Sequence, residues 1–532
     1  MTAHRKTALF TAVLLVSWTL AGASAARDRA KAPAVPAGID AVVNRALAAF
    51  EVPGIALAIV KDGQVVLAKG YGVRKLGEPA AVDSKTLFGI ASNTKVFTAV
   101  ALGILVEEGK LAWDAPVIDY LPGFQMWDPY VTRELTVRDL LVHRSGLGLG
   151  AGDLLWWPAS TYNREEIARR LRFIRPVASF RGAYAYDNVL YLVAGEVIKA
   201  VSGKGWEDFV GERILARIGM MLSNVRHSAA LDTGNVAATH ARIEGVVRPI
   251  KPMASDNTNP AGGINTCAED IAKWLQVLLA DGKLADGSRL FSERTARQIV
   301  APVTPMPNRE PPAEVAALRS NFSFYALGLN IQDYRGRKVV THTGGLPGYV
   351  SKVTRVPELG LGIAVLTNQE SGEAFSAITY DIIDRYMGAP KTDWVDAFLK
   401  LRAREAAEVA KAVELGEAAR NASSKPSLPL EKYAGAYEDA WYGDIGIAFE
   451  DGKLVMRFGH TPSLVGDMEH WQYDTFVVRW RDRETRADAF VTFALDPDGN
   501  IEQAKMRAVS PETDFSFDFQ DLLLLPARKP AA

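Results

Sequence analysis

Two hydrophobic periods follow one another near the start of the chain. Apolar residues first recur every three or four positions, as on one face of a helix: Ile39, Val42, Val43, Ala46, Leu47 and Phe50. Segments 54–60 and 64–72 are then rich in apolar and β-branched residues, with Lys61-Asp62-Gly63 between them. This pattern predicts a helix followed by a two-stranded hairpin.

Strand patterns return much later, at 338–343, 350–356 and 362–367, where glycines and Pro347 separate them. The chain between the two groups of strands is mainly helical in pattern and has long loops. One sheet built from both ends of a domain, with a helical region inserted, fits this order. Two separate domains are the alternative.

Two long loops are expected inside this domain. Segment 153–180 carries Trp156 and Trp157 directly before Pro158, and segment 301–312 carries five prolines. Because proline removes a backbone donor and restricts the preceding residue, the second segment is expected to be irregular.

The pattern changes again towards the C-terminus. Segment 396–422 is rich in Ala, Glu, Lys and Arg, as in a solvent-exposed helix, and 423–429 has the composition of a linker. Short β-branched and aromatic runs such as 476–480 and 489–495 follow. With 532 residues the chain is too long for one core, so we expect a first domain at 37–395 and a small all-β domain at 430–528.

The first 25 residues have the pattern of an export signal. A basic start precedes an apolar stretch at 8–20 and the small residues 23–25, the order that a signal peptidase recognises. The mature protein is therefore expected to begin near Ala26 and to be periplasmic or secreted; an uncut N-terminal anchor is the alternative. No later segment reaches the roughly 20 apolar residues of a membrane span, so no integral membrane segment is expected.

Charge, cysteine content and histidine spacing give no sign of a nucleic acid partner, a disulfide within the chain or a metal site. Lys and Arg number 61 against 62 Asp and Glu, a net charge of -1 that gives no reason to expect a nucleic acid partner. Cys267 is the only cysteine, so it cannot pair within the chain and is expected to be a buried structural residue. The histidines show no metal-ligand spacing, and neither a metal nor another cofactor is expected.

One short segment carries candidate chemistry. Ser92 and Lys95 precede a long apolar run, so a helix that begins at Ser92 would place both side chains on one face. A serine hydroxyl is a poor nucleophile until a base accepts its proton, and a desolvated lysine can be that base. Ser-x-x-Lys alone is also compatible with a helix cap followed by a surface lysine.

The context of this pair resembles the family of class C β-lactamases and penicillin-binding proteins. Four segments occur in the order typical of that family: 86–95 around Ser92, 135–147, Tyr186-Asp187-Asn188, and His342-Thr343-Gly344-Gly345. The resemblance covers roughly residues 37 to 390, and the C-terminal segment resembles a small β module often found behind such domains. It implies a β-lactamase-like α/β fold, with an antiparallel sheet flanked by helices, a helical subdomain and then a small all-β domain.

The resemblance also implies roles for individual residues. Tyr186 would exchange a proton with Lys95, and Asn188 would hydrogen-bond both Lys95 and the substrate. The backbone N–H groups of Ser92 and Gly345 would form the oxyanion hole. The alternatives are a core tyrosine for Tyr186 and a helix cap for Asn188.

His342 departs from the β-lactamase pattern, which has lysine at this position. A lysine holds a substrate carboxylate by charge, whereas a neutral imidazole offers only a hydrogen bond. The family's esterases and peptidases often carry histidine here. His342 is therefore expected to contact substrate and to disfavour β-lactams, unless it is only a packed strand residue.

These features together predict an exported serine hydrolase that cleaves amide bonds of short or unusual peptides through an acyl-enzyme at Ser92. Hydrolysis of linearised microcystin, an activity found in this family, is compatible with the size and export of the chain. A carboxylesterase for small molecules and a non-catalytic penicillin-binding scaffold are the alternatives. The partner is expected to be a small molecule or a short peptide, and the sequence gives no oligomeric state.

Overall fold

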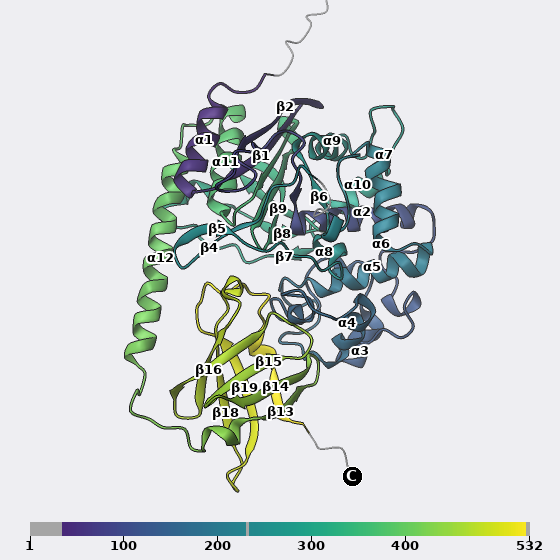
Figure 1. Cartoon of the computed structure of the whole chain (residues 1–532). Helices are drawn as coiled ribbons and strands as arrows, with labels where there is room; N and C mark the ends of the chain where they lie inside the picture. Colours follow the sequence, from purple (N-terminus) through teal and green to yellow (C-terminus); the bar gives the residue numbers. More distant parts are fainter. Residues whose placement is uncertain (1–33, 230–233, 528–532) are drawn as a thin grey trace, which may run out of the picture.

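An antiparallel sheet of eight strands forms the centre of the N-terminal domain (Figure 1). The computed structural model describes residues 34–229 and 234–527, so the expected export signal at 1–25 lies outside the described residues. The strand order is β2-β1-β12-β11-β10-β9-β8-β7. The strands are β1 Gly54–Lys61, β2 Gln64–Gly72, β7 Thr304–Pro305, β8 Ser323–Tyr325, β9 Asn330–Tyr334, β10 Arg337–Leu346, β11 Tyr349–Val356 and β12 Leu361–Thr367.

Both ends of the domain contribute to this sheet. Strand β1 pairs with its hairpin partner β2 on one side and with β12 on the other, in a register that places Ile55 opposite Thr367. The prediction of one sheet with an inserted helical region is confirmed, and the alternative of two separate domains is wrong. The helical region is therefore an insertion between strands of one sheet.

The sheet is covered on both faces, and the alternation along β1 shows why. Ile55, Leu57 and Ile59 pack in one apolar cluster, on the side of helices α1 (Ile39–Phe50), α11 (Gly372–Met387) and α12 (Trp394–Ala418). Ala56, Ala58 and Val60 belong to the second cluster, on the opposite face, where helix α9 (Ala268–Leu279) contacts β1 and β12. Successive side chains of a strand point to opposite faces, so a continuous apolar run is buried twice.

Most helices lie in the inserted region. Helix α2 is buried from Lys95 to Leu105, which places it inside this region rather than at its surface. The helices are α1 Ile39–Phe50, α2 Lys95–Glu107, α3 Pro129–Glu134, α4 Arg164–Arg170, α5 Val189–Ser202, α6 Trp206–Val210, α7 Ala216–Ile218, α8 Asn259–Gly262, α9 Ala268–Leu279, α10 Glu293–Ile299, α11 Gly372–Met387 and α12 Trp394–Ala418. Two short ribbons accompany them, β3 Phe88–Gly89 with β6 Asn265–Thr266 and β4 His240–Ile243 with β5 Val246–Pro249.

The two expected loops contain regular structure that the sequence did not reveal. Segment 153–180 includes helix α4, whose first turn is capped when the Asn163 side chain accepts a hydrogen bond from the N–H of Glu166. With seven residues it is too short for apolar periodicity to stand out. Segment 301–312 includes the two-residue strand β7, which ends the sheet beside β8, where a proline is tolerated.

A closed barrel of eight antiparallel strands follows the N-terminal domain (Figure 1). Helix α12 leads to it along the side of the N-terminal domain, and only residues of its first turns are buried. The strands are β13 Gly435–Asp439, β14 Gly443–Glu450, β15 Lys453–Phe458, β16 Val465–Gln472, β17 Thr475–Trp480, β18 Ala489–Leu495, β19 Ile501–Ala508 and β20 Leu523–Pro526. The predicted all-β C-terminal domain is confirmed. Among the described residues, no helix combines the length and apolar character needed to cross a bilayer.

Candidate active site

Ser92 lies in a tight turn between strand β3 and helix α2. The α-helix itself begins at Lys95, and residues Ala91–Thr94 form a 3₁₀ turn in front of it. Side chains three residues apart eclipse one another in such a turn, so Lys95 lies directly beside Ser92. Ala91 has a left-handed backbone, with φ of 49°, which is strained for a residue with a Cβ. The strained turn leaves Ser92 partly exposed at the surface of an otherwise buried segment.

Lys95 is held by a set of polar groups although its side chain is fully buried, with 0 % exposure. Its Nζ donates to Ser92 Oγ at 2.9 Å, to Asn188 Oδ1 at 2.7 Å and to the carbonyl of Ala261 at 3.1 Å. Burial lowers the pKa of Lys95 to about 7, although the nearby carboxyls act to raise it. An amine with this pKa is partly neutral at pH 7 and can accept a proton from Ser92.

Asn188 occupies the N-cap position of α5, but its side chain makes no capping hydrogen bond. Its Oδ1 instead accepts from Lys95, and its Nδ2 donates to Asp153 Oδ2 at 2.8 Å. The geometry therefore supports contact of Asn188 with Lys95 rather than a helix-capping role.

The ring of Tyr186 lies close to Lys95. The Lys95 Nζ is 5.0 Å from the centroid of its ring. Burial raises the pKa of Tyr186 well above 10, and contact with the Ser92 hydroxyl only partly offsets this effect. The resting phenol is therefore neutral, which suits a proton donor better than a phenolate base.

His342 lies close to Tyr186, with ring centroids 6.2 Å apart, and 3 % of its surface is exposed. Its Nε2 is 2.8 Å from the hydroxyl of Tyr325, and its Nδ1 contacts the carbonyl of Thr343. Burial, with a smaller contribution from Lys95, lowers the pKa of His342 to about 3, so the ring is neutral. Direct contact with substrate stays a prediction, and in this structure both ring nitrogens have protein partners.

Gly345 lies on a free edge of the sheet. Strand β9 pairs with β10 only as far as Thr341, whereas β11 pairs with β10 up to Leu346. Among the residues that the structure describes, no strand pairs with the other side of the backbone between these points, and a Cβ at Gly345 would meet only open space. Residues 344–346 thus offer backbone without a second strand partner beside the turn that holds Ser92, as both an oxyanion hole and an extended peptide require.

Two buried carboxyls that sequence reasoning missed complete the site. Asp153 Oδ2 accepts from Asn188, and its Oδ1 accepts from Trp156 Nε1 at 2.9 Å. Asp187 accepts from Ser145 and lies beside His143. Burial raises the pKa of Asp153 and that of Asp187 to about 7. Asp187 stands between two motif residues, whereas Asp153 belongs to no motif and only the fold brings it to Asn188.

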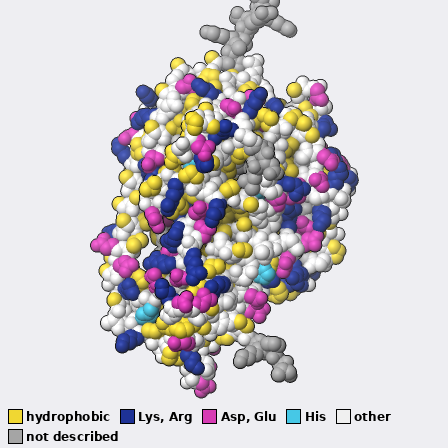
Figure 2. Space-filling model, in the orientation of Figure 1, with side chains coloured by type: hydrophobic (Ala, Val, Ile, Leu, Met, Phe, Trp, Pro, Cys, Tyr) yellow, Lys and Arg dark blue, Asp and Glu magenta, His cyan; other side chains and the backbone are white. Residues whose placement is uncertain are grey.

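A cleft of about 540 Å³ leads from Gly345 to the barrel. Trp157 and Leu346 line it from the N-terminal domain, and Phe517 and Arg486 line it from the barrel. Its cations have partners, because Lys251 pairs with Asp482 and Arg486 pairs with Glu370. Figure 2 shows Lys and Arg side chains interspersed with Asp and Glu on the visible face where the two domains meet.

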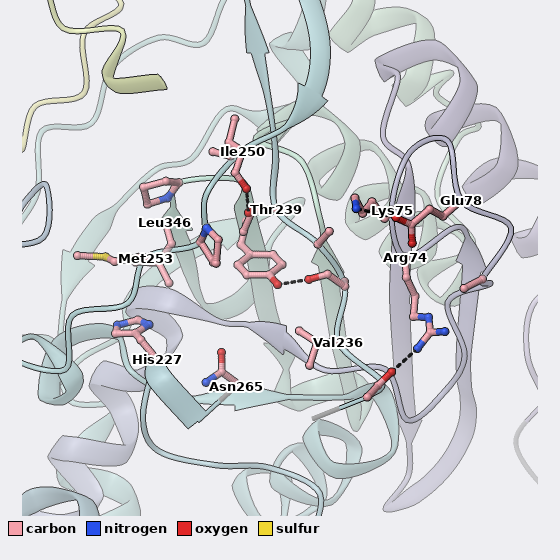
Figure 3. Close-up of a pocket in the computed structure, with 17 residues that line it drawn as sticks. Arg74, Lys75, Glu78, His227, Val236, Thr239, Ile250, Met253, Asn265 and Leu346 are labelled. Carbon is pink, nitrogen blue, oxygen red and sulfur yellow. Dashed lines mark hydrogen bonds and ion pairs between the residues drawn. The ribbon is translucent and has the colours of Figure 1, made fainter. Parts of the chain in front are cut away.

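A second cavity of about 360 Å³ lies beyond the β10–β11 turn and shares Leu346 and Pro347 with the cleft. Arg74 and Glu78 line one side, and Ile250, Met253 and Leu346 line the other (Figure 3). This cavity is not lined by Ser92, Lys95, Tyr186, Asn188 or Asp153. Among residues 34–229 and 234–527, no group of three or more His, Cys, Asp or Glu side chains could hold a metal ion.

Comparisons with known proteins agree with this geometry. The Beta-lactamase family model matches residues 39–386, and a domain of unknown function, DUF3471, matches residues 419–525. The unguisins hydrolase ungD of Aspergillus violaceofuscus is 28% identical over 491 residues, which cover 86% of this chain and 85% of that protein. The N-acetylmuramyl-L-alanine amidase of Bacillus subtilis is 27% identical over 62% of this chain and 80% of its own length.

Solved structures share the fold. The octameric penicillin-binding protein homologue from Pyrococcus abyssi aligns over 92% of this chain and 99% of its own, with a TM-score of 0.58 and 22% identity. The D-amino acid amidase from Ochrobactrum anthropi SV3 aligns over 66% of this chain and 97% of its own, with a TM-score of 0.52 and 22% identity. A family match over most of the chain, with Ser92 and Lys95 in contact, shows that this protein belongs to the Beta-lactamase family of serine hydrolases.

Proposed function

We propose that this protein is an exported serine hydrolase that cleaves amide bonds of short or unusual peptides through an acyl-enzyme at Ser92. The observation that carries the proposal is the 2.9 Å contact between Ser92 Oγ and the buried Lys95 amine. Burial favours the neutral amine, and a neutral amine at this distance is a base for the hydroxyl proton.

The geometry supports a two-step reaction. Lys95 Nζ accepts the proton of Ser92 as Oγ attacks the carbonyl carbon, and the oxyanion forms between the N–H groups of Ser92 and Gly345. Collapse of this intermediate breaks the C–N bond, and the amine leaves with a proton from Tyr186, which Lys95 restores. Water then attacks the acyl-enzyme with the same groups acting in reverse.

Three features favour peptides over β-lactams. An extended peptide can pair with the free edge of β10, and the cleft has the size of a site for a small molecule or short peptide. The two cations that line it, Lys251 and Arg486, are paired already, and the buried His342 is neutral, so none of these three side chains offers a free positive charge to a substrate carboxylate. The names of the relatives, among them an unguisins hydrolase and two amidases, point to amide bonds as well.

The test compares specificity constants for three substrate sets: short peptides that include D-residues, neutral acyl esters and a chromogenic cephalosporin. We expect the peptides to lead, with Ser92→Ala as the inactive control. A clear preference for esters would make the protein a carboxylesterase, and a preference for the cephalosporin would overturn the interpretation of His342. No turnover of any substrate would favour the scaffold alternative.

Export is tested separately. The proposal places the protein in the periplasm or the medium, with a mature N-terminus near Ala26. Fractionation of the producing cells and mass spectrometry of the purified protein measure both. An intact Met1 in a membrane fraction would support the uncut anchor instead.

A further inference from the structure

A loop of the barrel reaches the catalytic side of the N-terminal domain. Residues 509–522, which join β19 to β20 and are here named the barrel loop, contact the segment that holds Asp153. The Asp518 carboxyl is fully buried and accepts from the N–H of Gly152 at 2.6 Å and from that of Leu154 at 3.1 Å. The approach is close, since a Cβ at Gly150 would lie 2.6 Å from the carbonyl of Phe515.

One residue of this loop joins the hydrogen bonds of the active site. Ser516 Oγ donates to Asp153 Oδ2 at 2.8 Å, and this oxygen also accepts from Asn188. From Asn188 the chain of hydrogen bonds continues to Lys95 and then to Ser92. Ser516 is 363 residues from Asp153 in sequence and 3 % exposed.

We propose that Ser516 of the barrel is a positioning residue for the hydrolase, which fixes Asn188 and Lys95 through the carboxyl of Asp153. The inference rests on the proposed roles of Ser92 and Lys95. It makes the barrel a working part of the active site rather than an appended module.

The orientation of Asn188 explains how a distant hydroxyl acts. The Asn188 amide presents its oxygen to Lys95 only while its NH₂ group donates to Asp153. Asp153 in turn is held from two sides, by Trp156 at Oδ1 and by Ser516 at Oδ2. Without Ser516 the buried carboxyl loses one partner, so it can shift and release the Asn188 amide.

A second contact of the barrel loop, made by Phe515, supports the same proposal. Phe515, next to Ser516, is 40% exposed, and its ring centroid lies 6.0 Å from that of Tyr186 in an edge-on arrangement. The loop therefore contacts the proposed proton donor as well as the support of the proposed base. These two contacts lie at neighbouring residues of one loop.

The test compares Ser516→Ala with a matched control, Ser427→Ala. Ser427 also donates to an aspartate at 2.8 Å, but this partner, Asp474, belongs to the barrel. We expect Ser516→Ala to lower kcat by about ten- to a hundredfold while KM changes less than about threefold, because the loss is one of alignment. The control should keep wild-type kcat, and Ser516→Thr, which retains the hydroxyl, should recover most of the loss.

A second measurement separates this inference from the proposed substrate. The rate at which a fluorophosphonate labels Ser92 depends on Lys95 and Asn188 but on no natural substrate. We expect this rate to fall in Ser516→Ala, and to fall no further when Ser516→Ala is added to Asn188→Ala. Wild-type kcat and labelling in Ser516→Ala, or an undiminished further loss in the double variant, would overturn the inference. Labelled protein without peptide hydrolysis would count against the proposed function alone.

Discussion

At the scale of single residues, the opposite pKa shifts of Lys95 and Tyr186 divide the proton transfers between them. Burial disfavours charge on both side chains, so it makes the amine a better base and keeps the phenol protonated. One physical cause thus prepares an acceptor and a donor beside the same hydroxyl. Burial is the largest cause of both shifts, which favour a neutral Lys95 amine and a neutral Tyr186 phenol.

The first prediction concerns the nucleophile. Ser92→Ala should abolish turnover and leave the unfolding temperature within a few degrees of wild type, because Lys95, which donates to Ser92 Oγ, keeps Asn188 Oδ1 and the Ala261 carbonyl as partners. Activity and thermal unfolding measure the two effects. A fluorophosphonate should label Ser92 and leave Ser145 unmodified, since Ser145 is buried and its hydroxyl donates a hydrogen bond to Asp187. Label at Ser145 would contradict the assignment.

The second prediction concerns pH. Lys95 accepts a proton only when neutral, so kcat/KM should rise with pH through about 7 and level off above it. The charge of Asp187 raises the pKa of Lys95, so Asp187→Asn should lower this pKa and move the acidic limb to lower pH. Rates measured from pH 5 to 9 test both statements.

The control for the pH series is Asp286→Asn, which removes an exposed carboxyl of a loop and should leave the profile unchanged. The histidines of the site contribute nothing to this limb, because burial lowers the pKa of both His143 and His342. Asp153 and Asp187 also have pKa values raised to about 7, so a limb that stays in place in Asp187→Asn would contradict a charged Asp187 beside Lys95.

At the scale of elements, strand β10 and the turn before α2 are fitted together at Gly344. A Cβ at this position would lie 2.1 Å from the carbonyl of Ile90, which precedes the strained residue Ala91. No side chain can stand there unless the turn moves. The glycine therefore sets the distance between the nucleophile and the free edge of the sheet.

The third prediction follows from this contact. Gly344→Ala should displace the Ser92 turn, lower kcat by at least about tenfold and destabilise the fold by about 1–3 kcal/mol, the usual effect of overpacking. Gly446→Ala is the matched control, since Gly446 also lies in a strand but has open space around it. Equal kinetics in the two variants would show that β10 and the turn are not tightly coupled.

The same elements show what the sequence could predict. Strands 54–60, 350–356 and 362–367 are recovered within about a residue, because continuous apolar runs between turn residues mark buried strands. Helix α4 was not predicted, because it is stabilised by a cap and by charged residues at its ends rather than by an apolar stripe. Ser92, Lys95, Tyr186 and Asn188 stand in motifs, whereas Asp153 and Ser516 meet only through the fold.

At the scale of the whole molecule, the barrel and the N-terminal domain share buried polar contacts as well as the cleft. Tyr162 donates to the carbonyl of Tyr442, and Arg170 donates to that of Trp441 at 3.0 Å. Asp518 accepts from two backbone N–H groups of the other domain. Buried polar groups that lose such partners carry a desolvation cost, so separation of the domains is unfavourable.

The fourth prediction is that both domains unfold in one transition. Asp518→Ala leaves the N–H groups of Gly152 and Leu154 without acceptors, at a cost of about 1–3 kcal/mol each. We expect calorimetry to give a single transition for the wild type and a lower or divided transition for the variant. Two transitions in the wild type, of which only the barrel's responds to Asp518→Ala, would contradict this coupling.

The pairing of β1 with β12 also has a consequence for synthesis of the chain. The N–H of Gly54 donates to the side chain of Asn368, 314 residues further along. Strand β1, the first strand to be synthesised, therefore pairs with β12 only after nearly the whole domain has been synthesised. Contacts of such long range slow folding, because the loop between them must be closed before they form. During most of its translation the polypeptide therefore lacks its finished sheet, which can close only once residue 368 has been synthesised.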